Sequence, residues 1–174
     1  DGYRELAELL AKGGVDLIAL EMLEDTYHAS MAMEAALEVE LPIWLGISSR
    51  FGPDGKSLVA FDFPDVPLST LLQTLIPLGP LVVNIMHTEP NVVQTALEIL
   101  KQYWEGPVGV YPELGDFSAP DWVFNNLMEP QQFADHALEW VQAGARLLGG
   151  CCGTTPAHIR MLKDKMPDLL AARA

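Results

Sequence analysis

Cysteine is scarce in this sequence, because its 174 residues include only two, Cys151 and Cys152, which are neighbours. Adjacent cysteines rarely close a disulfide on each other without strain, and no spacing typical of a disulfide framework is present. Long apolar runs are also missing, since none approaches the roughly 20 residues that span a bilayer. Residues 1–5 lack the charged-then-apolar layout of a signal peptide. We therefore expect a protein of the reducing cytoplasm with no membrane partner.

Positive charge is scarce as well. Lysine and arginine number 10 against 24 acidic residues, which gives a formal net charge of −14. Such a surface repels phosphate backbones and anionic membrane faces, so nucleic acid is excluded as an expected partner. The acidic residues are scattered along the chain, which argues against a disordered acidic tail. With 49% hydrophobic residues, a chain of this length buries a sizeable core, and a globular domain is expected.

Short apolar runs alternate with amphipathic segments along the chain. The runs are continuous rather than alternating, which is typical of strands buried on both faces. The predicted strands cover residues 15–21, 43–49, 81–86, 107–111 and 146–150. Helical patterns cover residues 3–12, 26–37, 68–76, 91–104 and 131–143, and a further helix is expected to start at residue 155 or 156. The alternation predicts the α/β class with a parallel sheet.

Two longer loops, residues 50–67 and 113–129, interrupt this rhythm. Both follow a predicted strand, which is where α/β barrels carry insertions that handle substrate. A closed (β/α)8 TIM barrel needs eight strand–helix units and about 250 residues, whereas five units are visible here. We expect residues 1–174 to be one domain that forms the C-terminal portion of such a barrel, about strands 4 to 8. The alternative is a complete five-stranded doubly wound domain.

Both cysteines lie in the segment 147–156, which reads LLGGCCGTTP. Two thiolates can converge on one zinc ion, and the flanking glycines let the backbone approach a metal closely. The predicted helix start would add the positive end of its dipole, which favours thiolates. The alternative is a pair of small apolar residues packed at a strand end. The pattern favours zinc ligation by Cys151 and Cys152.

The string Gly150-Cys151-Cys152-Gly153-Thr154 resembles the zinc signature of the homocysteine S-methyltransferase family. This family includes the betaine–homocysteine methyltransferases and the homocysteine domain of cobalamin-dependent methionine synthase. Further segments match the family's later strands in order: residues 14–21, 42–48, 83–84 and 111–115. Family barrels place these strand ends at one mouth, around zinc and the thiol of homocysteine.

The resemblance implies a zinc-dependent S-methyltransferase that transfers a methyl group to the thiol of homocysteine and forms methionine. Cys151 and Cys152 would be its catalytic metal ligands, and Glu21 would bind the substrate amino group. Its expected partners are homocysteine, a small-molecule methyl donor, and additional domains or further copies in the full-length protein. Two alternatives remain: a methyltransferase for another small thiol, or a non-catalytic metal-binding or interaction barrel.

One departure from the family pattern concerns the metal. Family members usually carry a third cysteine directly after the asparagine that matches Asn84, but Ile85 stands there. His87 is two residues further on, and imidazole is a good zinc ligand. Two residues of extended chain move a side chain by about 6–7 Å, so the chain must bend back to bring His87 to the metal. The alternative is an exposed loop histidine.

Three further polar residues are candidates for substrate binding. Glu113 stands where the family usually has asparagine, and it either pairs with a substrate ammonium or is a solvated loop charge. Glu21 has the alternative of capping the next helix. Asn84 either orients a substrate carboxylate or closes a backbone turn. The remaining histidines fall on helical segments and are expected at the surface: His28, His136 and His158.

Overall fold

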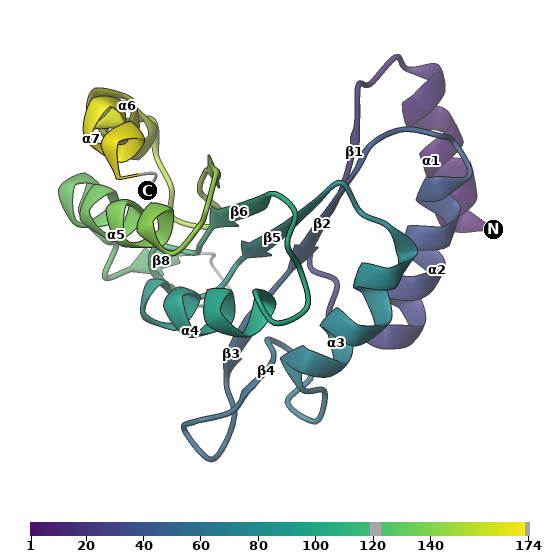
Figure 1. Ribbon diagram of the computed structural model, residues 1–174, viewed down its shortest axis with the longest axis horizontal. Coiled ribbons are helices and arrows are strands. Elements are labelled where there is room, and N and C mark those ends of the chain that lie inside the picture. The colour runs from purple at the N-terminus through teal and green to yellow at the C-terminus, as the bar shows by residue number, and fades with distance from the viewer. Residues whose placement is uncertain (119–122, 173–174) are drawn as a thin grey trace.

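The fold was obtained as a computed structural model that describes residues 1–118 and 123–172. Its centre is a sheet of five strands in the order β1-β2-β5-β6-β9 (Figure 1). Every neighbouring pair is parallel. The strands are β1 (Ile18–Leu20), β2 (Ile43–Ile47), β5 (Val82–Met86), β6 (Val108–Tyr111) and β9 (Leu147–Leu148). All five predicted strands are confirmed, each shorter than its apolar run.

Helices follow the strands and cover one side of the sheet. They are α1 (Gly2–Lys12), α2 (Thr26–Leu37), α3 (Leu68–Leu75), α4 (Pro90–Leu100), α5 (Pro130–Gln142), α6 (Pro156–Asp164) and α7 (Met166–Ala171), with a 3-10 turn, η1 (Ile76–Leu78), after α3. Proline opens α4, α5 and α6, where its missing N–H has no intrahelical partner to lose. The predicted helices are confirmed, and α7 is an addition to them.

The order of the strands decides between the two predicted architectures. A doubly wound sheet reverses its strand order at a switch point and carries helices on both faces. Here the spatial order is the chain order, so right-handed crossovers place every connecting helix on the same face. Figure 1 shows these helices on one side of the curved sheet. The doubly wound alternative is therefore wrong, and the five strands form a portion of a (β/α)8 barrel, with β1 and β9 as its edge strands.

Successive side chains of each strand point alternately to the helices and to the opposite, interior face of the sheet. On β5, Val83 and Ile85 are fully buried in the hydrophobic core shared with the helices. Asn84 lies on the opposite side, where its Oδ1 sits so close to Gly109 that no Cβ would fit there. Ile85 is therefore a core residue rather than part of a site.

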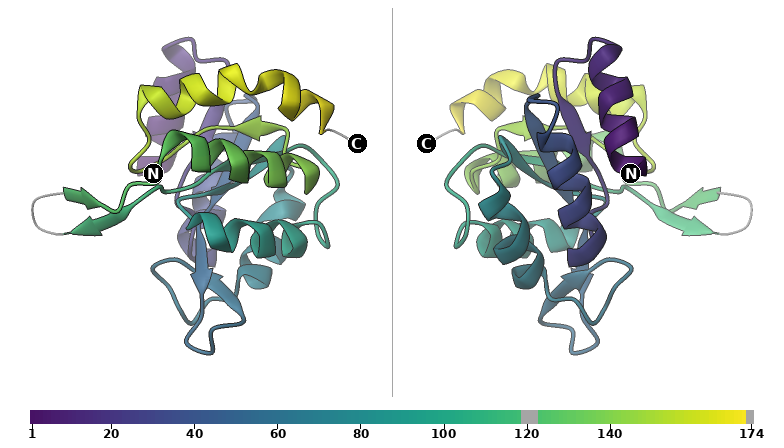
Figure 2. Two further views of the ribbon diagram at one scale, coloured as in Figure 1. Left: turned by 90° about the vertical axis from the view of Figure 1, so that its left-hand side faces the viewer. Right: turned by 90° about the vertical axis from the view of Figure 1, so that its right-hand side faces the viewer.

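Each of the two long loops contains an antiparallel hairpin that the sequence patterns did not predict. Strand β3 (Ser49–Phe51) pairs with β4 (Leu58–Ala60), and β7 (Asp116–Ser118) pairs with β8 (Val123–Asn125). Figure 2 shows both hairpins extending away from the five-stranded sheet. The strands are only three residues long, which is too short for a clear periodicity.

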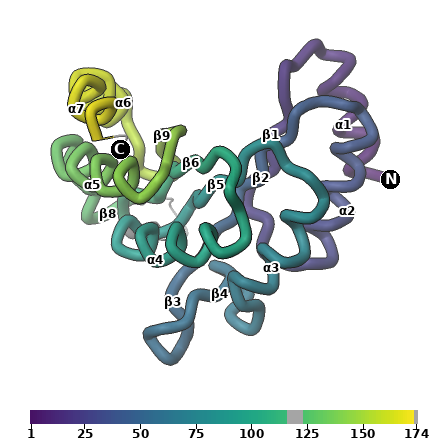
Figure 3. The backbone as a smooth tube through the Cα atoms, in the orientation of Figure 1, coloured from purple at the N-terminus to yellow at the C-terminus, as the bar shows by residue number. Residues whose placement is uncertain are grey.

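The two chain ends lie at opposite ends of the sheet, with α1 near β1 and α6 and α7 near β9 (Figure 3). Both ends expose apolar side chains. Leu6 and Leu9 of α1 are 56% and 58% exposed, and Met166 and Leu170 of α7 are similarly open. Within the described ranges, no helix has both the length and the apolar character needed to cross a membrane.

These exposed surfaces predict that the isolated 174-residue chain self-associates, because unpaired sheet edges and apolar helix faces attract further copies. Sedimentation velocity at micromolar concentration should show species heavier than one chain. Replacing Leu6 and Leu9 together by glutamate should shift the population towards monomer. The control is Phe63→Glu, which removes an exposed aromatic side chain from the loop after β4. Monomeric behaviour of the unmodified chain would contradict the prediction.

Candidate metal centre

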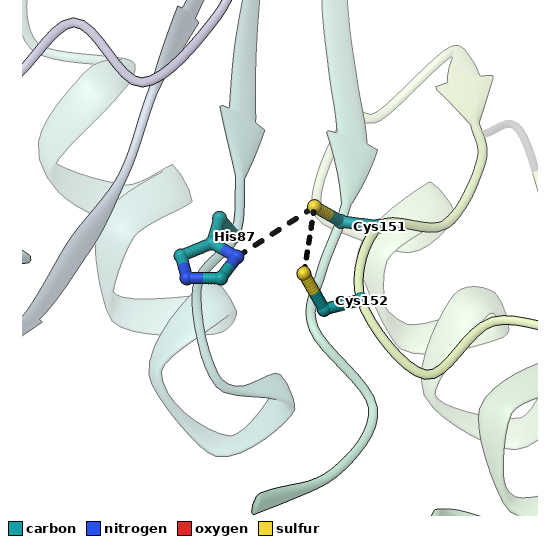
Figure 4. Close-up of side chains that lie close together, drawn as sticks. All are labelled: His87, Cys151 and Cys152. Carbon is teal, nitrogen blue, oxygen red and sulfur yellow. Dashed lines mark hydrogen bonds between the residues drawn. The ribbon is translucent and has the colours of Figure 1, made fainter. Parts of the chain in front are cut away.

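Three potential metal ligands meet at the carboxyl ends of the parallel strands. The side chains of His87, Cys151 and Cys152 each offer one ligand atom, and these atoms lie within 4.8 Å of one another. The Nδ1 of His87 is 3.6 Å from the Sγ of Cys151, and the two Sγ atoms are 3.9 Å apart (Figure 4). All three residues are partly buried, so the group faces a cleft without being sealed off.

His87 reaches the group because the chain turns sharply after β5. Its φ is +44°, in the left-handed region that residues with a Cβ rarely adopt. The backbone N–H of His87 donates to the carbonyl oxygen of Tyr111 at 3.2 Å, which anchors the turn to β6. The bend that the spacing of two residues after Ile85 requires is therefore present. The imidazole thus lies with the cysteines, and its alternative as an exposed loop histidine is not the observed arrangement.

The cysteine loop is held by backbone bonds to the segment that follows β6. Cys151 N–H donates to the carbonyl of Pro112 at 3.0 Å, and the carbonyl of Cys152 accepts from Leu114 N–H at 2.8 Å. Gly153 then takes a φ of +79°, which a glycine adopts without steric cost. This turn leads into α6.

The start of α6 is fixed by a capping box. The Thr155 side chain accepts from a backbone N–H of the first turn, and the ring of His158 bonds back to the Thr155 N–H. The other ring nitrogen of His158 lies 2.7 Å from the carbonyl oxygen of Met128. His158 is 3% exposed, so its predicted surface location is wrong. The imidazole of His158 can be buried because both of its nitrogens have hydrogen-bond partners, Thr155 and Met128.

Two of the three spacings in this group match those around a tetrahedral zinc ion. With zinc–sulfur bonds of about 2.3 Å and zinc–nitrogen bonds of about 2.0–2.1 Å, tetrahedral angles put two sulfurs about 3.8 Å apart. The same geometry puts a sulfur and a nitrogen about 3.6 Å apart. The observed distances of 3.9 Å and 3.6 Å match both values. Two cysteines and one histidine leave a fourth position open, as in catalytic zinc sites.

The electrostatics of the group also suit a cation. Burial, together with the adjacent Cys152 thiol, raises the pKa of the Cys151 thiol to about 11. Without a cation, Cys151 is therefore protonated at neutral pH, whereas a metal ion stabilises the thiolate. Burial lowers the pKa of His87 despite the opposing charges of Glu24 and Asp62. Its imidazole is thus neutral at pH 7 and has a lone pair for a metal.

The group lies in a cleft of about 970 Å³ at the mouth of the sheet. Four carboxylates are among its lining residues: Glu21, Asp62, Glu89 and Glu113. Among the described residues that line it, neither lysine nor arginine is present. The cleft is therefore electronegative, which favours a metal cation and a substrate ammonium group.

The cleft brings together most of the candidate residues from the sequence. Glu21 follows β1 and lines the cleft, while Asp25 caps α2 by accepting from the N–H of His28 at 2.8 Å. The alternative role of Glu21 as that cap is therefore wrong. Glu113 also lines the cleft and is 9% exposed, so it is not a solvated loop charge.

Asn84 is the one candidate that the structure does not bring to the cleft. It is fully buried within β5, on the face of the sheet opposite the helices. Its Nδ2 donates to the carbonyl oxygen of Leu45 at 3.4 Å, and within the described part of the chain its Oδ1 has no hydrogen-bond partner. A role in binding a substrate carboxylate remains a prediction for this residue.

Sequence reasoning missed two contributors from the segment after β4. The ring of Phe61 meets the His87 ring edge to face, with centroids 4.8 Å apart. Asp62 lines the cleft, and its N–H donates to the buried Glu24 carboxylate at 2.8 Å. Glu24 also accepts from the Ser48 hydroxyl. No spacing in the sequence connects these residues, because a hairpin separates them from β2.

Fold and side chains together define a barrel-type α/β protein with a thiol and imidazole group, suited to a soft metal ion, at the mouth of its sheet. Residues 1–166 match the profile of the family described as Homocysteine S-methyltransferase. The chain belongs to this family.

Known proteins similar to this chain agree with that assignment. Homocysteine S-methyltransferase 3 of Arabidopsis thaliana is 28% identical over 176 residues, which cover 97% of this chain and 48% of that protein. Selenocysteine Se-methyltransferase of Brassica oleracea var. italica is 27% identical over 173 residues, with coverages of 95% and 48%. The metallated form of the homocysteine methyltransferase MmuM from Escherichia coli superposes with a TM-score of 0.70 at 26% identity, covering 94% and 51%. The chain thus spans about half the length of its relatives.

We expect zinc retention to depend on all three members of the group. In the full-length protein, Cys151→Ser or Cys152→Ser should abolish stoichiometric zinc, since a protonated hydroxyl replaces a thiolate poorly. His87→Ala should lower zinc occupancy strongly. The matched control is His136→Ala, because His136 lines the same cleft outside the group. Elemental analysis after dialysis measures the occupancy. Unchanged occupancy in His87→Ala would remove this residue from the ligand set.

Gly153→Ala should destabilise the loop that carries the cysteines. A residue with a Cβ in this left-handed conformation costs about 1–2 kcal/mol. Its Cβ would also lie 2.7 Å from the Cδ2 of Leu127. Gly55→Ala is the matched control, because Gly55 has a φ of +64° but open space around the added Cβ. Urea unfolding of the full-length protein should show a larger loss for Gly153→Ala, and equal losses would contradict the packing argument.

Proposed function

We propose that the protein containing this chain is a zinc-dependent S-methyltransferase that methylates the thiol of homocysteine and forms methionine. In this proposal residues 1–174 belong to one homocysteine-binding barrel domain. The observation that carries it is the group of His87, Cys151 and Cys152 at the mouth of the sheet, in which the distances from Cys151 to the other two ligand atoms match those around tetrahedral zinc. Membership in the homocysteine S-methyltransferase family supports the choice of substrate.

The reaction requires a nucleophilic sulfur, and a free thiol with a pKa near 8.5 is mostly protonated at neutral pH. Zinc, when bound, lowers the pKa of a coordinated thiol and so keeps the substrate sulfur as a thiolate. Cys151, Cys152 and His87 would hold the metal and leave the fourth position to that sulfur. The sulfur then forms a bond to the methyl carbon as the bond between this carbon and the donor breaks.

Glu21 is the proposed partner of the substrate ammonium group. Its carboxylate lines the cleft and lies near enough to Cys151 to contribute to the raised pKa of that thiol. A substrate whose sulfur binds beside Cys151 would therefore place its amino group within reach of Glu21. A charge-assisted hydrogen bond there would be stronger than a neutral one and would select amino-acid thiols.

A second candidate substrate is another small thiol or a selenol. The observation that favours it is the similarity to the Selenocysteine Se-methyltransferase of Brassica oleracea var. italica. Selenium, like sulfur, is a soft donor that suits a metal with thiolate ligands. Competition between homocysteine and selenocysteine for the zinc-loaded protein would rank the two substrates.

Calorimetry of homocysteine with the zinc-loaded full-length protein tests the main proposal. Entry of the thiol as a thiolate should release about one proton near neutral pH, visible as a dependence of the heat on the buffer. Glu21→Ala should weaken homocysteine binding about tenfold or more, with zinc content unchanged, because a charged hydrogen bond is lost. Glu89→Ala, which removes another carboxylate from the cleft, should have the smaller effect. Binding without proton release, or no binding at millimolar homocysteine, would contradict the proposal.

A further inference from the structure

Two departures from the family pattern face each other in this structure. His87 lies beside the two cysteines in a chain that lacks the family's third cysteine, and Glu113 stands where the family usually has asparagine. The Nε2 of His87 lies 3.6 Å from the Oε2 of Glu113. The other nitrogen of the same ring, Nδ1, lies 3.6 Å from the Sγ of Cys151. The imidazole thus lies between a thiol on one side and a carboxylate on the other.

The backbone fixes Glu113 relative to the cysteine loop. On one side of it, the carbonyl of Pro112 accepts from the N–H of Cys151 at 3.0 Å. On the other side, the N–H of Leu114 donates to the carbonyl of Cys152 at 2.8 Å. The backbone on both sides of Glu113 is therefore tied to the cysteine loop by direct hydrogen bonds.

Burial strengthens the contact between the two side chains. The His87 side chain is 18% exposed and that of Glu113 is 12% exposed, so water screens their interaction weakly. An imidazole that binds a metal through Nδ1 carries its proton on Nε2, the nitrogen that here lies 3.6 Å from the Glu113 carboxylate. A carboxylate in this place fixes the orientation and tautomer of a metal-binding histidine.

We propose that Glu113 is a positioning residue that orients His87, so that His87 serves as the third metal ligand in place of the absent cysteine. This inference rests on the proposed function, because it assumes that His87 is a zinc ligand. It assigns Glu113 a role through His87 rather than through the substrate ammonium group. Removal of such a carboxylate typically lowers metal affinity about 10- to 100-fold.

A double-mutant cycle on zinc affinity tests the proposal. Zinc binding to the full-length protein is measured by competition with a chromophoric chelator for the unmodified protein, Glu113→Gln, His87→Ala and the double variant. Glu113→Gln should weaken binding about 10- to 100-fold when His87 is present. It should cause no further loss in the His87→Ala background. Glu89→Gln is the matched control, since it removes a carboxylate from the same cleft and should change affinity little.

Cobalt(II) substitution supplies a readout that a general loss of stability would not change. The visible bands of the cobalt protein should shift in Glu113→Gln only when His87 is present. Glu113→Asp keeps the charge and should restore part of the affinity, which also serves if the glutamine variant folds poorly. Affinity equal to that of Glu89→Gln, or an equal loss with and without His87, would overturn the proposal. Unchanged affinity in His87→Ala would instead refute the ligand assignment on which it rests.

Discussion

The candidate metal centre depends on the parallel pairing of β5, β6 and β9, which continues into the segments beyond the strand ends. Tyr111 accepts from the N–H of His87 on one side, and Pro112 accepts from the N–H of Cys151 on the other. The middle segment therefore holds a ligand from each neighbouring segment at a fixed separation. Parallel strands bring their carboxyl ends to one edge, so a change in the register of either pair would separate the imidazole from the thiols.

His87 lies beside Cys151 and Cys152, although the position directly after Asn84 holds isoleucine. Ile85 belongs to the core between sheet and helices, where its aliphatic side chain stabilises the packing. The left-handed turn at His87 returns the chain to the mouth two residues later, at a cost in backbone strain of about 1–3 kcal/mol. Strain of this kind persists where surrounding contacts enforce it, here the bond to Tyr111 and the packing against Phe61.

The sequence predicted the five strands and their parallel order, because buried strands and capped helices have local patterns. The Cys-Cys pair between glycines and the family resemblance made Cys151, Cys152 and His87 candidate metal ligands, and the structure brings these three side chains together. The sequence did not predict the features that depend on tertiary contacts. The burial of His158 follows from a partner 30 residues away, the carbonyl of Met128. The contact between Glu113 and His87 joins two loops, and only the closure of β5 against β6 brings them together.

X-ray absorption spectroscopy of the zinc-loaded full-length protein tests whether Cys151, Cys152 and His87 bind the zinc, because it reports the ligands of the metal itself. If Cys151, Cys152 and His87 bind the zinc, the spectrum should show two sulfur atoms at about 2.3 Å and an imidazole nitrogen at about 2.0 Å. Addition of homocysteine should raise the number of sulfur neighbours to three while the imidazole stays. A spectrum without imidazole scattering would rule out His87 as a ligand, and a sulfur number that homocysteine leaves unchanged would rule out binding of its thiol to the zinc.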